Sequence, residues 1–116
     1  MSAKTIKIDK DHILLKEGQE SNSLYWLQTG TMVATRKKNG EDVVLGHIYS
    51  GELVGELSFL DESPRSATVK ALSECEIIEI PHDAYHKIFD GQPRWFQILV
   101  KTLCERLRKA NARIKI

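Results

Sequence analysis

Residues Gly51–Thr68 read GELVGELSFLDESPRSAT, and this stretch carries most of the information in the chain. Its two glycines, Gly51 and Gly55, allow the backbone to approach another group closely. The five residues Glu56–Leu60 are just long enough for one helical turn, which the following DESP sequence up to Pro64 interrupts. Because a helical turn begins with unpaired N–H groups, the stretch predicts a compact anion-binding site where that turn starts.

Charged side chains before and after that turn indicate the kind of anion. Arg65 follows the interruption, and its planar guanidinium suits the two parallel hydrogen bonds that a phosphate accepts. Ser66 adds a hydroxyl donor. Glu56 would repel the anion, so we expect it to accept hydrogen bonds from neighbouring sugar hydroxyls. The pair predicts a sugar phosphate or nucleotide of low charge, because a triphosphate brings several negative charges to a single arginine.

Short apolar runs surround this stretch at the spacing of about 8–12 residues that is typical of β-sandwiches and barrels. The segments predicted as strands are Thr5–Ile8, Ile13–Lys16, Leu24–Gln28, Thr31–Lys38, Glu41–Ile48, Ala67–Ala71 and Glu76–Ile80. The Asn39-Gly40 pair predicts a two-residue type I′ hairpin in which Lys38 and Glu41 face each other. Both faces of the returning strand are mostly apolar, so we expect that strand to be buried on both sides or to line a cavity.

The periodicity becomes helical after Ile80. Pro81 is expected at the first position of a helix that continues over His82–Phe89 and ends at Asp90-Gly91. A second helix is predicted from about Arg94 to the C-terminus, with a heptad-type apolar stripe formed by Phe96, Val100, Leu103, Leu107, Ala110 and Ile114. The stripe either packs on its own barrel or forms a parallel two-fold homodimer. We expect the dimer, because a helix of about 30 Å would extend past so small a β-roll.

The sequence therefore predicts a mainly β fold with C-terminal helices: a β-roll (double-stranded jelly roll) followed by a short and a long α-helix. Residues 1–116 are expected to form a single domain, with the β-roll over about 5–80 and the helical tail over about 81–116.

The segments Val54–Leu60 and Pro64–Thr68 together resemble the phosphate-binding cassette of the cyclic nucleotide-binding domain family. This family includes catabolite-activator-type regulators, regulatory subunits of cyclic-nucleotide-dependent kinases, and gated channels. The resemblance covers nearly the whole chain. Two features depart from the family pattern: Val54 replaces the usual aromatic residue before Gly-Glu, and the leading helix of the family has no counterpart after Met1.

The resemblance implies a role for each matching residue. Glu56 would hold the ribose 2′-OH and Arg65 would pair with the cyclic phosphate, with further phosphate contacts from Ser66 and the backbone of Ala67. The residues implied to shape the ribose pocket are Gly55 and Leu57, and those implied near the base are Ala34, Leu45, Val54 and, on the last helix, Asn111.

Composition excludes several other classes of protein. The 116 residues carry 17 Lys and Arg against 16 Asp and Glu, a net charge of +1, so no general attraction to nucleic acid is expected. No apolar run reaches the ~20 residues of a membrane span, and the N-terminus lacks a signal-peptide core. Cys75 and Cys104 are isolated, as in reduced cytoplasmic proteins. No catalytic residue or cofactor is predicted.

One metal-like motif, His82-Asp83-Ala84-Tyr85-His86, spaces two histidines as in zinc proteases. It lacks both the Glu that acts as the base and a recognisable third ligand, so we expect an exposed polar helix face and no metal centre.

These observations predict a non-catalytic, cytoplasmic cyclic nucleotide sensor that binds cAMP and signals through its C-terminal helices. The open alternatives are a cGMP sensor and a structural or dimerisation domain of the same fold without a nucleotide ligand. No helix-turn-helix, kinase, channel or cyclase segment is recognised, so the output is expected to pass through a protein partner or a dimer.

Overall fold

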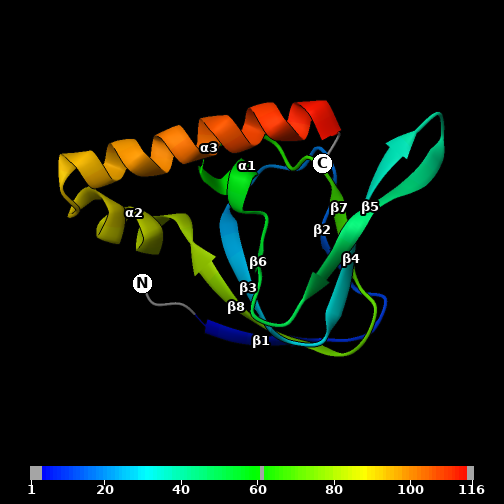
Figure 1. The fold of residues 1–116 in the computed structure, drawn as a ribbon. Helices are drawn as coiled ribbons and strands as arrows, with labels where there is room; N and C mark the ends of the chain where they lie inside the picture. The colour runs from blue at the N-terminus through cyan, green and yellow to red at the C-terminus, as the bar shows by residue number, and fades with distance from the viewer. Residues whose placement is uncertain (1–3, 61, 115–116) are drawn as a thin grey trace.

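The structure is a computed structural model that describes residues 4–60 and 62–114, and the side chains of these except Leu57 and residues 111–114. Two four-stranded antiparallel sheets face each other and form the β-roll, and the helices lie along one side of it (Figure 1). The strand order is β1-β8-β3-β6 in the first sheet and β2-β7-β4-β5 in the second. This confirms the predicted mainly β fold with C-terminal helices.

The strands of the first sheet are β1 (Lys4–Ile8), β3 (Ser23–Thr29), β6 (Leu53–Val54) and β8 (Cys75–Pro81). Those of the second sheet are β2 (Ile13–Leu15), β4 (Thr31–Lys38), β5 (Glu41–Tyr49) and β7 (Thr68–Ala71). The helices are α1 (Glu56–Leu60), α2 (His82–Asp90) and α3 (Arg94–Ile114). Seven of these strands match the predicted ones closely. The two-residue β6 was not predicted, because so short a run carries no detectable alternation.

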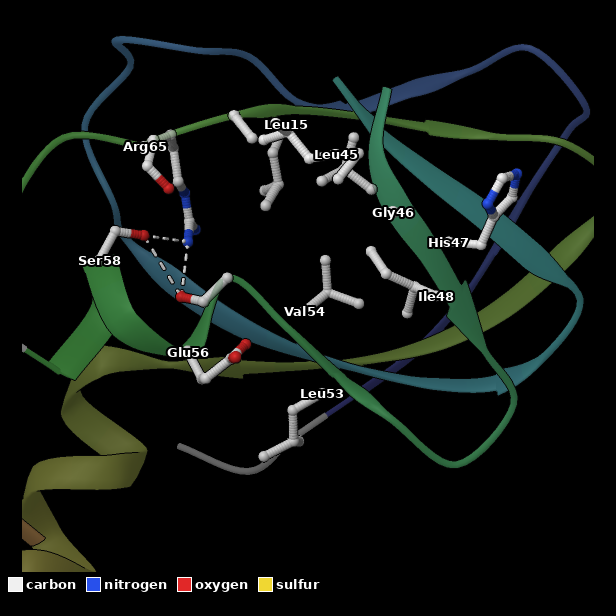
Figure 2. A pocket seen from close by; sticks show the side chains of 15 residues that line it. Leu15, Leu45, Gly46, His47, Ile48, Leu53, Val54, Glu56, Ser58 and Arg65 are labelled. Carbon is white, nitrogen blue, oxygen red and sulfur yellow. Dashed lines mark hydrogen bonds between the residues drawn. The ribbon is translucent and has the colours of Figure 1, made fainter. Parts of the chain in front are cut away.

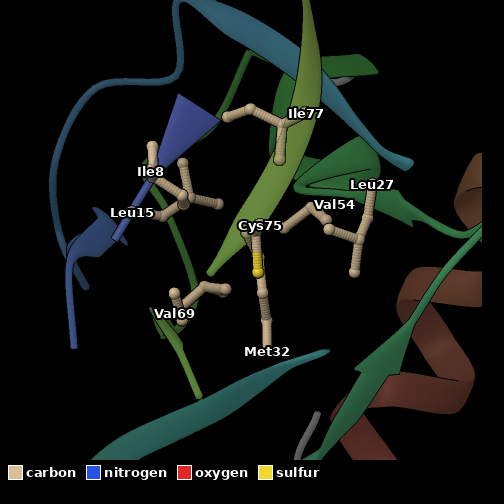
Figure 3. Close-up of a cluster of buried hydrophobic side chains, with 9 residues drawn as sticks. Ile8, Leu15, Leu27, Met32, Val54, Val69, Cys75 and Ile77 are labelled. Carbon is tan, nitrogen blue, oxygen red and sulfur yellow. The ribbon is translucent and has the colours of Figure 1, made fainter. Parts of the chain in front are cut away.

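A single apolar core fills the space between the sheets. Figure 3 shows side chains from both sheets converging on it, including Leu27 and Ile77 from the first and Met32 and Val69 from the second. Leu27, Met32 and Ile77 are fully excluded from solvent. The core therefore holds the two sheets together and fixes the strand ends that surround the α1 segment.

The β4–β5 hairpin confirms the predicted turn. Asn39 and Gly40 both adopt positive φ, 55° and 81°, and Lys38 is paired with Glu41. The expectation that β5 is buried on both sides is wrong, because Val43, Val44 and Tyr49 are exposed and β5 forms the edge of its sheet. The alternative expectation holds, since the central part of β5 lines a cavity.

The helical tail begins where predicted, with one local difference. Pro81 is the N-cap of α2, with extended backbone at φ −73° and ψ 161°, rather than its first helical residue. Figure 1 shows α3 running back over α2 and α1. Arg108 donates from Nη2 to the Ser63 hydroxyl at 3.1 Å, so this part of α3 lies beside the segment that leads from α1 to β7.

No helix within the described residues combines the length and the apolar character that crossing a membrane requires.

Candidate functional site

A cavity of about 280 Å³ lies between β5, the β6–α1 segment and the segment that leads into β7. Figure 2 shows Ser58 bonded to Arg65 at one end, with Glu56 lower on the same side, and β5 at the other end, with Leu45 and Gly46. The side chains between them are mainly aliphatic. The cavity thus has one charged end and a long apolar wall.

A β-bulge shapes the apolar wall. Ala34 pairs with Gly46 and Thr35 pairs with Val44, so Leu45 is the extra residue on β5. A bulge interrupts the strict alternation of side chains between the two faces of a strand. The bulge shifts this alternation at Leu45, and residues Leu45–Ile48 of β5 border the cavity.

Gly55 connects the apolar wall to the charged end. Its φ of +76° lies in the left-handed region, and a Cβ atom built there would overlap Nη1 of Arg65. Only glycine avoids both the strain and the clash. The carbonyl oxygen of Gly55 accepts the first hydrogen bond of α1 from Phe59 N at 3.2 Å. Gly55 therefore permits the turn into α1 and the close approach of the arginine.

Arg65 is buried, with 5% of its surface exposed, and forms hydrogen bonds to three segments of the chain. Its Nη1 donates to Gly55 O and to the Ser58 hydroxyl, both at 3.0 Å, and its Nη2 donates to Ser23 O at 2.6 Å. Its backbone N–H donates to Gln19 O at 2.8 Å. The sequence predicted that Arg65 returns to the start of α1, and the structure places its guanidinium there.

The charge of Arg65 is held in a partly desolvated place. Burial lowers the pKa of its guanidinium, and the nearby Tyr25 opposes this shift. An arginine remains protonated in a protein despite such a shift. A guanidinium has five N–H donors and three hydrogen bonds are formed within the described residues, so donors remain for a ligand in the cavity.

The structure brings most of the predicted site residues around this one cavity. Those that line it are Gly55, Glu56, Arg65, Ser66 and Ala67 from the predicted phosphate and ribose site, and Ala34, Leu45 and Val54 from the predicted base pocket. Glu56 is half-buried. Ser66 is exposed, and its carbonyl oxygen accepts a hydrogen bond from Nε of Arg36 at 3.1 Å. The side chains of Leu57 and Asn111 lie outside the described residues.

Several residues of the cavity were not predicted from the sequence. Ser58 is buried and bonds the guanidinium, but a lone serine within a helical turn carries no signal for that role. The unpredicted apolar and β5 residues of the lining are Leu15, Gly46, His47, Ile48, Leu53 and Val69. The strand pattern contained the β5 residues, but the bulge at Leu45 is not visible in it.

Within residues 4–60 and 62–114, no three His, Cys, Asp or Glu side chains are grouped as a metal ion requires. The described lining of the cavity offers one buried cation, Arg65, one carboxylate, Glu56, and apolar surface. These groups suit a small ligand that carries a negative charge, hydroxyl groups and a flat apolar part.

Comparison with known proteins supports the same class of ligand. Residues 5–92 match the sequence profile of the cyclic nucleotide-binding domain. The chain is 30% identical over 103 residues to the cAMP-activated global transcriptional regulator of Haemophilus influenzae, covering 87% of this chain and 46% of that protein. The chain spans about half the length of the curated transcriptional regulators it matches.

Solved structures share the fold. An EAL enzyme in its cAMP-bound form aligns with a TM-score of 0.83 and 27% identity, over 94% of this chain and 29% of that one. The regulatory domain of Toxoplasma gondii PKA with cAMP aligns with a TM-score of 0.72 and 31% identity, over 74% of this chain and 33% of that one. The catabolite activator protein of Thermus thermophilus aligns with a TM-score of 0.79 and 25% identity, over 97% of this chain and 54% of that one. On the profile match over residues 5–92, this chain belongs to the cyclic nucleotide-binding domain family.

Proposed function

We propose that this chain is a non-catalytic sensor that binds cAMP in the cavity beside Arg65. In this proposal the guanidinium of Arg65 pairs with the cyclic phosphate, supported by Ser66 and the Ala67 backbone. Glu56 accepts hydrogen bonds from the ribose 2′-OH. The observation that carries the proposal is a buried guanidinium at the end of an apolar cavity, with three of its five N–H groups bonded to the described residues.

The size and lining of the cavity support a single nucleotide. Its volume of about 280 Å³ is just below the range for small-molecule sites, about 300–1,000 Å³. Ala34, Leu45 and Val54 line the part away from Arg65, which is where we place the base. One arginine is matched to the single charge of a cyclic phosphate, whereas a triphosphate would bring further charges and the described lining residues include no second Lys or Arg.

We propose cAMP as the ligand and cGMP as the alternative. The transcriptional regulators that the chain matches are named as cAMP-activated, whereas the EAL enzyme was solved both with cAMP and with cGMP. The hydroxyl of Ser66 lies on the cavity and is a candidate acceptor for the amino group of guanine. Base preference is therefore measured in the experiment below.

The proposed output is a change in the position of α2 and α3. Phe59 of α1 packs against the His82 and Tyr85 rings of α2, with ring centroids 4.2 and 5.1 Å apart. A ligand that binds more tightly when α1 and the helices close over it shifts the population toward that arrangement. The motion is then passed to a dimer partner or to another protein. We propose no catalytic activity, no cofactor and no direct nucleic-acid contact for these residues, in a cytoplasmic protein.

We also propose that α3 forms a parallel two-fold homodimer. Several of its large apolar side chains are exposed, including Leu103 at 54% and Leu107 at 44%. Trp95, Ile98 and Leu99 extend the exposed apolar surface of the same helix. Sedimentation velocity with and without cAMP tests this, and a monomer at every accessible concentration would contradict it.

Thermal unfolding with cAMP, cGMP and a cyclic dinucleotide tests the sensor itself. A ligand at 100 times its Kd adds about 2.7 kcal/mol of stability, which raises the Tm of a domain of this size by several degrees. We expect the largest rise with cAMP. A larger rise with cGMP would support the alternative ligand. No rise with any of the three would contradict the sensor and favour a structural or dimerisation domain of the same fold.

A further inference from the structure

Two histidine rings on the first turns of α2 lie next to each other, away from the nucleotide cavity. His82 and His86 are half-buried, and Nδ1 of His82 lies 3.3 Å from Nε2 of His86. We propose that this pair binds a divalent transition metal ion that prefers nitrogen ligands, of the Zn²⁺ or Ni²⁺ class. The sequence predicted an exposed polar helix face and no metal centre here, but both histidines are half-buried, and the proposal is a binding site without catalysis.

The separation of the two nitrogens matches the geometry of such an ion. Zinc–imidazole bonds are about 2.0–2.1 Å long, and two of them at the tetrahedral angle place their nitrogens about 3.3 Å apart. The two ring atoms that face each other here have that spacing. Imidazole is also the ligand that Zn²⁺, Cu²⁺ and Ni²⁺ share. The two nitrogens therefore already have the spacing that one bound ion requires.

The second ring nitrogen of His82 contacts a backbone carbonyl, as is common for histidines that bind metal ions. Its Nε2 lies 3.1 Å from Ser21 O, and because a carbonyl oxygen only accepts, Nε2 carries the hydrogen in this contact. The lone pair of the neutral ring is then on Nδ1, which faces His86. A backbone carbonyl that fixes the far N–H of a histidine is a common outer contact of metal ligands.

Aromatic neighbours limit the movement of both rings. The His82 ring packs on Phe59 with centroids 4.2 Å apart, and the His86 ring contacts Tyr85 with centroids 5.5 Å apart. The two histidine rings are stacked with centroids 5.4 Å apart. This packing reduces the conformational entropy that would be lost when a metal orders the rings.

The surroundings of the pair provide space and negative charge. A hollow of about 550 Å³ is lined by both histidines together with Glu20 and Glu62. Within the described residues no third His, Cys, Asp or Glu completes a set of three protein ligands, so water molecules fill the remaining positions. We therefore expect a site weaker than a structural zinc centre, in which two imidazoles provide the selectivity.

Calorimetric titration with Ni²⁺ tests the proposal in the wild-type chain and in three variants. We expect one ion per chain, and an affinity at least about tenfold lower in His86→Gln and in His82→Gln. His12→Gln removes an exposed histidine elsewhere and is expected to bind as the wild type does. Equal affinities in the wild type and His86→Gln, or a loss in His12→Gln, would overturn the proposal.

A second measurement on the wild-type chain does not depend on the folding of any variant. Ni²⁺ is paramagnetic, so substoichiometric amounts broaden the NMR signals of the rings it contacts. We expect the ring signals of His82 and His86 to broaden first and that of His12 to persist. Broadening of all four histidines together would show only non-specific binding. Neither experiment contains a nucleotide, so the result is independent of the proposed sensor function.

Discussion

The cassette and the helical tail are held in place in different ways. The cassette, residues 54–68, is held in place by Arg65, which has 5% of its surface exposed. Arg65 forms hydrogen bonds to the Gly55–Ser58 turn, to Ser23 and to Gln19. In the tail, α2 has no buried residue, and α3 exposes Trp95 at 68% and Leu103 at 54%. The cassette is thus positioned by its own contacts, whereas the helices that follow retain apolar surface for another contact. Rigidity around the ligand and freedom in the helices are what a sensor needs.

The largest expected effect comes from removing the cation of the cassette. We expect Arg65→Ala to lower cAMP affinity by about 2–5 kcal/mol, thirtyfold to several thousandfold, because the cyclic phosphate loses its charged partner. From the sequence we expected this variant to remain folded. The structure adds a stability cost of about 1–3 kcal/mol, because the buried Ser23 O loses the hydrogen bond from Nη2, whereas Gly55 O keeps the one from Phe59 N.

Calorimetry with cAMP measures the first effect, and urea unfolding without ligand measures the second. Arg65→Lys retains the positive charge without the planar fork, so we expect partial affinity. Lys7→Ala, on β1, is the control, since its side chain is 76% exposed. Unchanged affinity in a folded Arg65→Ala protein would refute the assignment of the phosphate site.

Matched leucine substitutions compare the packing of the core between the sheets with that of α3. Leu27 is fully buried in the core, so Leu27→Ala is expected to lower the free energy of unfolding by about 2–5 kcal/mol. Leu103 is 54% exposed on α3, so Leu103→Ala is expected to change it by about 0.5 kcal/mol or less in a monomeric sample. Urea unfolding at several protein concentrations measures both. If the loss of unfolding free energy in Leu103→Ala grows with protein concentration, the dimer is supported. If Leu27→Ala and Leu103→Ala lose the same unfolding free energy in dilute samples, the expected difference between the core and α3 is contradicted.

Removing a partner of Arg65 has a smaller effect than removing Arg65. The Ser58 hydroxyl accepts a hydrogen bond from Nη1 of Arg65 at 3.0 Å. We expect Ser58→Ala to lower cAMP affinity about two- to tenfold. The hydrogen bond that holds the guanidinium in place contributes about 0.5–1.5 kcal/mol, and the variant loses it. Ser50→Ala, at an exposed serine, is the control in the same calorimetric titration. If both variants bind equally well, Ser58 has no part in positioning the arginine.

The smallest expected effect is a change at alkaline pH. Burial, and then the Glu79 carboxylate that accepts a hydrogen bond from the Tyr25 hydroxyl at 3.2 Å, raise the pKa of Tyr25. The folded chain therefore keeps this proton at a pH where the unfolded chain has begun to lose it. The stabilisation is complete below about pH 10, the ordinary pKa of tyrosine, and is lost as the pH rises through the folded-state pKa.

Tyr25→Phe removes this contribution. In urea unfolding between pH 8 and 11 we expect the variant to lose less stability than the wild type above pH 10. If the free energy of unfolding falls equally in both proteins above pH 10, Tyr25 is not the group responsible for the loss.

The sequence was sufficient for features that depend on local chemistry. Asn39-Gly40 specified the hairpin, Gly55 and Pro64 bounded the α1 turn, and Asp90-Gly91 ended α2. Each of these residues acts on its own backbone or on that of its nearest neighbours, so its effect is visible in a short stretch of sequence.

The features that were missed depend on distant parts of the chain. The contact of Arg65 with Ser23 O uses a backbone carbonyl 42 residues away, and a carbonyl leaves no signature in a sequence. The bulge at Leu45 is a property of the β4–β5 pairing and cannot be read from β5 alone. The contact of His82 with Ser21 O spans 61 residues, so the motif looked like an exposed helix face.

The place of β5 in its sheet has a consequence for how this family can diversify. β5 pairs with β4 on one side and ends the sheet on the other, and its bulged residues form the wall opposite Arg65. If the cavity holds a nucleotide as we propose, mutations along this strand would reshape the wall where we place the base and leave the charged end unchanged. On the same proposal, a change of base preference would not require a change at Arg65.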